Sequence, residues 1–116
     1  LIAEEIVQKS GNAQITNCCG AFSFLQTAAL MKDAAMNYTN DSAPLHFASA
    51  MNARVTAVFC STVPQFGFGP LSTESYILEE ESDLYCRPCG LHGYKSCPEK
   101  HFDCAKKIHM KTFLPG

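Results

Sequence analysis

The run VTAVFC at residues 55–60 constrains the fold of this chain most strongly. It is apolar almost throughout, which is typical of a strand covered on both faces, as in the parallel sheets of α/β proteins. Shorter segments at residues 34–38 and, more weakly, 13–19 predict two further strands, and a helical pattern stands between successive strands. This alternation with short connections favours a parallel sheet with right-handed crossovers.

The first two expected helices have recognisable ends. Residues 1–10 carry a one-sided apolar stripe that stops at Gly11, a residue suited to a C-terminal cap. Ser23 and Gln26 have the spacing of a capping box, so we expect a helix over residues 24–32. The side chains expected on its buried face are Phe24, Leu25, Ala28, Ala29 and Met31.

Ser42 can cap a third helix, with Pro44 in the first turn, where its missing N–H costs nothing. The side chains of this helix that we expect to face the core are Leu45, Phe47, Ala48 and Met51. A loop rich in glycine and proline follows the 55–60 run, and residues 76–78 predict an edge strand.

The chain changes character near residue 84, because four of its seven cysteines fall between positions 86 and 104. We therefore expect an α/β domain with a parallel sheet over residues 1–83. A cysteine-rich extension packed on it would occupy residues 84–116. Leu1 already lies inside a helical pattern, which indicates a piece of a longer protein that begins within a domain.

Composition argues against several classes of function. The chain is 47% hydrophobic and 17% charged, so it can bury a core. With a formal net charge of -2 we expect no nucleic-acid partner, and no segment resembles a membrane span or secretory signal. The acidic stretch at residues 74–83 and the basic tail after residue 86 are either solvated surfaces or, for the tail, a peripheral membrane contact or a face for an anionic acceptor.

The stretch TNDS at residues 39–42 places four polar side chains at the junction between an expected strand and the helix that follows it. Ligands of open α/β sheets bind beyond the carboxyl ends of the strands. The N–H groups and dipole of the following helix favour a phosphate, whereas Asp41 would repel one and suits sugar hydroxyls. The pattern therefore suggests a ligand with both groups, and plain helix capping by Asp41 or Ser42 is the alternative.

The segment YTNDSAPLHFASAMNARVTAVFCST, with FSFLQTAALMKDA before it, resembles the donor half of the glycosyltransferase family 9 heptosyltransferases. The resemblance covers about residues 1–105. It implies a Rossmann-like fold with three layers for residues 1–83, as the C-terminal, donor-binding domain of a two-domain GT-B enzyme. It also implies inverting transfer of heptose from ADP-heptose to the lipopolysaccharide inner core, in the cytoplasm at the inner face of the bacterial inner membrane.

Carried over by position, the resemblance gives roles to residues of the turn. Asp41 would hold heptose hydroxyls, Ser42 and the backbone of Ala43 would contact the diphosphate, and His46 would support the turn or reach a phosphate. The family usually has glycine at position 43, so the alanine Cβ is expected to weaken phosphate binding or shift the loop. The expected donor-binding residues are Phe22, which falls where the family packs a side chain near adenine, with Asn40, Asp41, Ser42, Ala43 and His46.

The same resemblance implies that the transfer uses no metal or other cofactor. A carboxylate base from the N-terminal domain would deprotonate the acceptor hydroxyl, and that domain would select the acceptor. This chain has no counterpart that we can place for that base or for the family's upstream phosphate-binding lysine. We expect the chain alone to bind donor weakly and to be inactive.

The cysteine-rich segment has the ligand count of a tetrahedral structural zinc site. The expected ligands, in the spacing CX2CX7CX6C, are Cys86, Cys89, Cys97 and Cys104. His92 or His101 could replace one of them, and free thiols or disulfides are alternatives, although a reducing cytoplasm argues against disulfides. A catalytic metal is not expected because four cysteine ligands leave no open position.

The remaining cysteines, Cys18, Cys19 and Cys60, lie in strand-like runs and are expected to be small buried hydrophobes. Two other classes of function stay open at this point. One is a non-enzymatic, zinc-stabilised binding module, and the other is a different sugar-nucleotide enzyme such as an epimerase.

Overall fold

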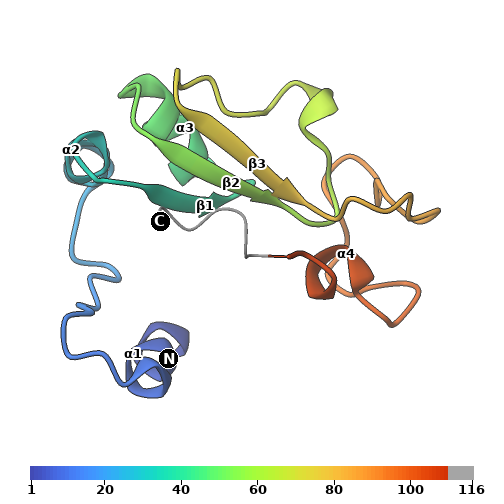
Figure 1. Ribbon diagram of the computed structural model, residues 1–116, viewed down its shortest axis with the longest axis horizontal. Coiled ribbons are helices and arrows are strands. Elements are labelled where there is room, and N and C mark those ends of the chain that lie inside the picture. Colours follow the sequence, from blue (N-terminus) through green and yellow to red (C-terminus); the bar gives the residue numbers. More distant parts are fainter. Residues whose placement is uncertain (110–116) are drawn as a thin grey trace.

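The computed structural model describes residues 1–109, and its centre is a sheet of three parallel strands in the order β1-β2-β3 (Figure 1). The strands are β1 (Asn37–Asn40), β2 (Val55–Phe59) and β3 (Ser75–Glu79). Helix α3 (Ala43–Ala50) connects β1 to β2, and the 3-10 helix η1 (Pro64–Phe66) lies in the loop from β2 to β3. The expected α/β chain with a parallel sheet is confirmed.

The central strand β2 is the most deeply buried part of the sheet, as its apolar sequence predicts. Val55 pairs with Asn37 on one side and with Ser75 on the other, so all three strands start in register. The first, third and fifth side chains of β2 point to the face that α3 covers. The core cluster consists of Met31, Leu45, Ala48, Ala53, Val55, Ala57 and Phe59.

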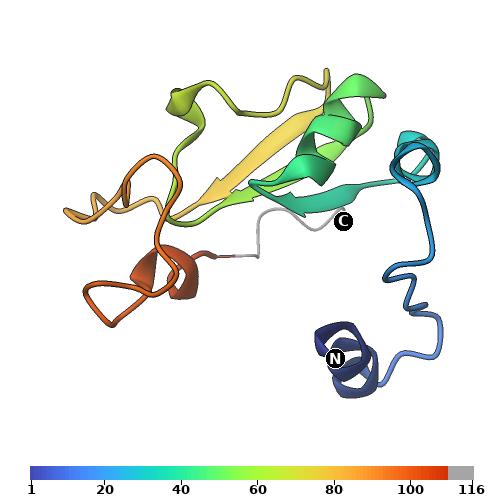
Figure 2. The same cartoon turned by 180° about the vertical axis from the view of Figure 1, so that it is seen from behind.

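Helix α3 begins as expected, with Ser42 at its N-cap and proline in its first turn. The loop from β2 to β3 returns along this helix (Figures 1 and 2). Ser72 donates a hydrogen bond from Oγ to the Ala48 carbonyl (3.2 Å), and the Thr73 N–H donates to the Asn52 side chain (2.8 Å). Helix α3 thus packs on β1 and β2, and the loop is hydrogen-bonded to the end of this helix.

Helix α2 (Phe24–Lys32) starts at the expected capping box. Ser23 Oγ accepts from the Gln26 N–H (3.2 Å), and Gln26 Oε1 accepts from the Ser23 N–H (2.9 Å). The expected buried face is wrong for most of its positions: Met31 is buried, but Phe24 and Leu25 are 76% and 84% exposed. The reason is that α2 packs on α3, so that only its last turn reaches the core.

Helix α1 (Ile2–Ser10) ends at Gly11, whose φ is 61°, as its sequence predicts. None of its residues is buried, and it stands apart from the sheet in both views (Figures 1 and 2). Of the helices in residues 1–109, α3 is the one that packs closely on the sheet. These helices therefore do not form the third layer that we expected.

The expected strand at residues 13–19 is wrong, because this segment consists of turns and irregular backbone. Asn12 accepts a hydrogen bond from the Gln14 N–H (2.9 Å), and Asn17 accepts one from the Cys19 N–H (3.0 Å). Such local bonds offer the backbone an alternative to a sheet ladder. Consequently Cys18 and Cys19 are exposed rather than buried.

The strand expected at residues 34–38 is displaced toward the C-terminus and ends at Asn40. The Asn37 N–H donates to the Arg54 carbonyl (3.0 Å), and the Asn37 side-chain amide donates to the Met31 carbonyl (2.9 Å). Asn37, a polar residue, is thus the first residue of β1, and its side chain connects the strand to the end of α2 by a hydrogen bond. Asn40 consequently belongs to the strand and Asp41 is the first residue beyond it.

We predict that Leu45→Ala lowers the free energy of unfolding by about 2–5 kcal/mol, because Leu45 is fully buried between α3 and β2 and its truncation leaves a cavity. Leu71→Ala removes the same atoms from a side chain that is 83% exposed and should cost less than about 0.5 kcal/mol. Urea denaturation of both variants measures the difference. Equal losses would show that the core is placed wrongly.

Candidate functional site

The turn between β1 and α3 is held by two side-chain hydrogen bonds. Thr62, which follows β2, donates from Oγ1 to Oδ2 of Asp41 over 2.6 Å. Ser42 donates from Oγ to Oδ1 of Asn40, and its side chain makes no capping hydrogen bond to α3. Thr62 is buried and Asp41 is exposed. The Asp41 carboxylate is therefore fixed through one oxygen and keeps the other for a further partner.

A cavity of about 390 Å³ opens beside this turn. The structure brings four of the expected donor-binding residues together in its lining, namely Asp41, Ser42, Ala43 and His46. The lining residues that the sequence did not indicate are Thr62, Val63, Phe66, Phe68, Leu91 and His92.

Two expected residues do not line this cavity. Asn40 lies next to it at the end of β1, where its side chain accepts the hydrogen bond from Ser42. Phe22 precedes α2 and is 43% exposed. Its expected place beside an adenine stays a prediction.

The cavity has a polar side and an apolar side. Asp41, Ser42 and the start of α3 supply a carboxylate, a hydroxyl and the Ala43 N–H, since Pro44 has no N–H and that of Leu45 donates to the Ser42 carbonyl. Phe68 supplies an aromatic face, and its ring lies edge-on to the His46 imidazole with the two centroids 6.5 Å apart. Such a mixture of convergent polar groups and aromatic rings is typical of a small-molecule site.

One of the missed residues had a signal in the sequence. Thr62 closely follows the buried strand β2, and the carboxyl ends of neighbouring parallel strands meet at one edge of a sheet. It could therefore have been placed beside Asp41. Leu91 and His92 gave no such signal, because their position depends on how the cysteine-rich segment docks.

A second cavity, of about 280 Å³, is lined by the four cysteines that we expected to bind zinc. His101 lines it too, whereas His92 lines the first cavity, so the structure separates the two histidines. All seven cysteines of the chain are free thiols. Among residues 1–109, no three His, Cys, Asp or Glu side chains are arranged so that they could hold a metal ion, and zinc stays a prediction.

The thiols of this second cavity differ in their electrostatic surroundings. The Phe102 N–H donates to the Cys97 sulfur (3.4 Å), and this and neighbouring backbone N–H groups lower the pKa of Cys97. Burial raises the pKa of Cys104, and the nearby Cys60 acts in the same direction. Tyr85 donates to a Glu99 carboxylate oxygen (2.6 Å), which raises the pKa of Tyr85 to about 12.

Arg87 anchors the cysteine-rich segment to the end of the sheet. Its guanidinium donates to the Cys60 carbonyl (2.8 Å) and to the Thr62 carbonyl (2.9 Å), and it pairs with Glu79. The Cys89 N–H donates to the Ser61 carbonyl over 2.7 Å. The same loop that carries Thr62 therefore holds this segment in place.

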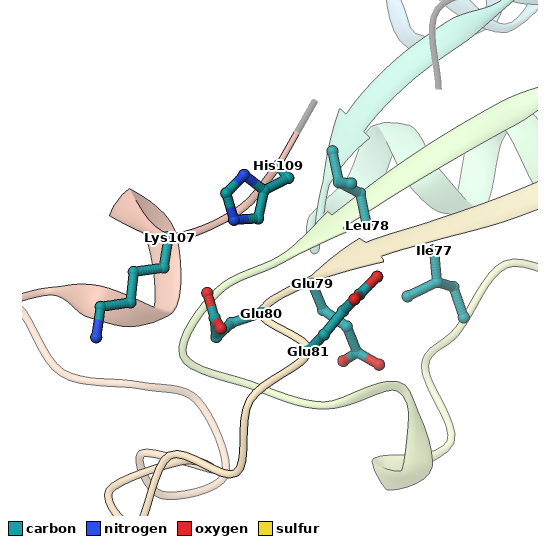
Figure 3. A pocket seen from close by; sticks show the side chains of 7 residues that line it. All are labelled: Ile77, Leu78, Glu79, Glu80, Glu81, Lys107 and His109. Atoms are coloured by element: carbon teal, nitrogen blue, oxygen red, sulfur yellow. The ribbon is translucent and has the colours of Figure 1, made fainter. Parts of the chain in front are cut away.

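A third cavity, of about 190 Å³, lies at the end of β3 (Figure 3). Part of the acidic stretch lines it, and Lys107 and His109 lie nearby, the former just after the short helix α4 (Asp103–Lys106). Hydrogen bonds from Ser82 lower the pKa of Glu80, and the charges of Lys107 and His109 act in the same direction. None of the expected donor-binding residues lines this cavity, and we assign it no site.

No helix within residues 1–109 combines the length and apolarity needed to cross a bilayer.

Comparison with known proteins gives two matches. The family model described as glycosyltransferase family 9 (heptosyltransferase) matches residues 1–100. Lipooligosaccharide heptosyltransferase 2 of Campylobacter jejuni subsp. jejuni is 29% identical in an alignment that covers 97% of this chain and 34% of that protein. The chain thus spans about a third of the length of this curated relative. No solved structure gives a significant match.

We predict that Arg87→Gln speeds hydrogen exchange at the Cys89 amide, whose bond to Ser61 depends on the docked segment. Losing hydrogen bonds from a charged, largely buried side chain should cost about 1.5–3 kcal/mol of local stability. Arg54→Gln is the matched control, because the Arg54–Glu74 pair is exposed and such pairs contribute about 0–1 kcal/mol. Unchanged Cys89 exchange in Arg87→Gln would contradict the anchoring role.

Proposed function

The chain belongs to glycosyltransferase family 9, the heptosyltransferases, and from this premise we propose that it forms the donor-binding part of an inverting GT-B glycosyltransferase. The proposed reaction transfers heptose from ADP-heptose to the inner core of lipopolysaccharide. Support comes from the family match and from a relative that is named as a lipooligosaccharide heptosyltransferase. The acceptor site belongs, in this proposal, to the part of the protein outside this chain.

The single observation that carries the proposal is the fixed Asp41 carboxylate in the cavity at the carboxyl edge of the sheet. Thr62 occupies one carboxylate oxygen at 2.6 Å, which sets the orientation of the group without neutralising it. A carboxylate held in this way accepts hydrogen bonds from sugar hydroxyls. Asp41 is therefore the proposed heptose ligand.

The proposed diphosphate position is the start of α3. Ser42 turns its hydroxyl toward Asn40, so no side chain caps the helix, and Ala43 is exposed at the cavity. The Ala43 N–H and the helix dipole favour an anion there, whereas Pro44 has no N–H to offer. His46, one turn into the same helix, lines the cavity and can donate a hydrogen bond to a phosphate.

In the proposed mechanism the acceptor hydroxyl attacks the anomeric carbon of heptose from the side opposite ADP. A base expected on the other domain takes the hydroxyl proton as the new C–O bond forms. The bond from the anomeric carbon to the phosphate oxygen breaks, ADP leaves, and the anomeric centre is inverted. Groups at the start of α3 stabilise the negative charge that develops on the leaving diphosphate.

The two other classes of function are not favoured. A non-enzymatic binding module does not account for a family match that extends from residue 1 to residue 100. An epimerase would use a similar cleft, but the curated relative is named as a transferase. We propose that the enzyme acts in the cytoplasm, at the inner face of the bacterial inner membrane, where the basic residues after position 86 would face an anionic acceptor or the membrane surface.

We predict that Asp41→Asn in the full-length protein weakens binding of ADP-heptose about 10- to 150-fold, because hydrogen bonds to a charged group contribute about 1.5–3 kcal/mol. Binding of ADP should change by less than about threefold, since Asp41 is assigned to the sugar. Isothermal titration calorimetry with both ligands measures this split.

The matched control for this variant is Asp33→Asn, which changes an exposed aspartate at the end of α2. It should leave the affinity for both ligands unaltered. An equal loss for ADP and ADP-heptose in Asp41→Asn, or no loss at all, would contradict the assignment of Asp41 to heptose.

We also propose that the second cavity binds a structural zinc ion through Cys86, Cys89, Cys97 and Cys104. Support comes from their shared cavity and from the N–H groups that favour a Cys97 thiolate. Binding requires the four sulfurs to close to about 2.3 Å from the ion. The transfer itself would use no metal.

Metal analysis of the purified full-length protein tests this site. We predict about one equivalent of zinc per chain, lost in Cys86→Ser together with Cys89→Ser, because a tetrahedral site needs all four ligands. Cys18→Ser, which changes an exposed cysteine outside the cavity, should keep the zinc. Zinc well below one equivalent, or disulfides among the four cysteines, would rule out the site.

A further inference from the structure

The cavity beside the Asp41 turn, which we propose binds the donor, is lined in part by two residues of the cysteine-rich segment. This segment lies outside the β1–α3 motif from which most of the donor-binding residues were predicted. Leu91 and His92 line the cavity together with Asp41, although about fifty residues of sequence separate them from that turn. The first supplies apolar surface, and the second supplies a side chain that can donate a hydrogen bond and carry a positive charge.

The backbone around these residues is placed by close contacts with the loop after β2. The Cys89 N–H donates to the Ser61 carbonyl (2.7 Å), which fixes the chain just before Leu91. Gly93, just after His92, lies close to the same loop: its φ is +74°, and a Cβ at this position would lie 2.5 Å from Ser61 Oγ. An alanine at this position would be strained by the positive φ, and the Ser61 side chain or the segment would have to shift. His92 therefore lines the cavity on a stretch that is hydrogen-bonded to Ser61 before it and lies close to Ser61 after it.

The residues that line the cavity include few groups that can bind an anionic diphosphate, and His92 is one of them. The cavity contains one carboxylate, that of Asp41, and no lysine or arginine among its lining residues. The groups of the lining that can be cationic are the imidazoles of His46 and His92. A departing diphosphate develops negative charge that fixed positive groups and N–H donors must stabilise. Two imidazoles from different segments can bracket that anion.

We propose that His92 is a further donor-binding residue that hydrogen-bonds to the diphosphate of the nucleotide sugar. The cysteine-rich segment thereby forms one wall of the donor site. This inference rests on the proposed function, because it takes a nucleoside diphosphate as the ligand of the cavity. His92 supplements the α3 N-terminus, where Pro44 has no N–H and that of Leu45 already donates to the Ser42 carbonyl (3.0 Å).

The test compares His92→Gln and His92→Ala with the unaltered full-length protein in calorimetric titrations with ADP, AMP and ADP-heptose. We expect His92→Ala to weaken ADP and ADP-heptose binding about tenfold or more, with a smaller loss for AMP, which lacks the β-phosphate. His92→Gln keeps an N–H donor and should recover part of the loss. Because His92 is exposed, neither change is expected to prevent folding.

His109→Ala is the matched control, since it truncates an exposed histidine that lines a different cavity. It should bind all three ligands like the unaltered protein. If the unaltered protein binds none of them, the proposed function fails. If that protein binds ADP and His92→Ala binds it equally well, the inference alone is overturned.

A second variant tests the placement of His92 without touching its side chain. Gly93→Ala introduces a Cβ at a positive φ and against Ser61, so it should shift the segment that carries His92 and weaken ADP binding in the same direction as His92→Ala. In the double variant the two losses should not add, because both remove the same contact. Additive losses, or a Gly93→Ala protein that is folded and binds ADP normally, would contradict the proposed wall.

Discussion

The parallel pairing of β1 with β2 is the constraint on which the site depends. It brings the carboxyl ends of both strands to one edge of the sheet, where the hydroxyl of Thr62 reaches the carboxylate of Asp41 at 2.6 Å. A one-residue slip in this register would send alternate side chains of β1 to the opposite face. Burial of β2 against α3 prevents the slip, so the hydrophobic core indirectly sets the geometry of an exposed carboxylate.

The loop after β2 has a second role, because it carries the docking contacts of the cysteine-rich segment. Arg87 binds the carbonyls of Cys60 and Thr62, and the Cys89 N–H binds that of Ser61. Three consecutive residues thus connect the sheet, the Asp41 turn and the distal segment. The cavity lined by the cysteines and the cavity beside Asp41 are neighbours in the fold for this reason.

Local sequence signals predicted local structure well. The Ser23–Gln26 capping box, the Gly11 cap and the buried strand β2 are all present, because spacing or composition within a few residues determines them. The strand expected at residues 13–19 failed where asparagine side chains satisfy the backbone locally. The exposed face of α2 could not be predicted, since burial depends on what lies opposite a helix.

The residues of the candidate site also differ in whether a local sequence pattern could predict them. Asp41, Ser42, Ala43 and His46 come from one continuous motif and meet in one cavity, as the sequence indicated. Leu91 and His92 reach it only through long-range docking, which no local pattern encodes. The most direct test of the account is a crystal structure of the full-length protein with ADP-heptose. We predict the diphosphate at the start of α3 and the heptose hydroxyls on Asp41, whereas a donor bound at another cavity, away from this turn, would contradict the account.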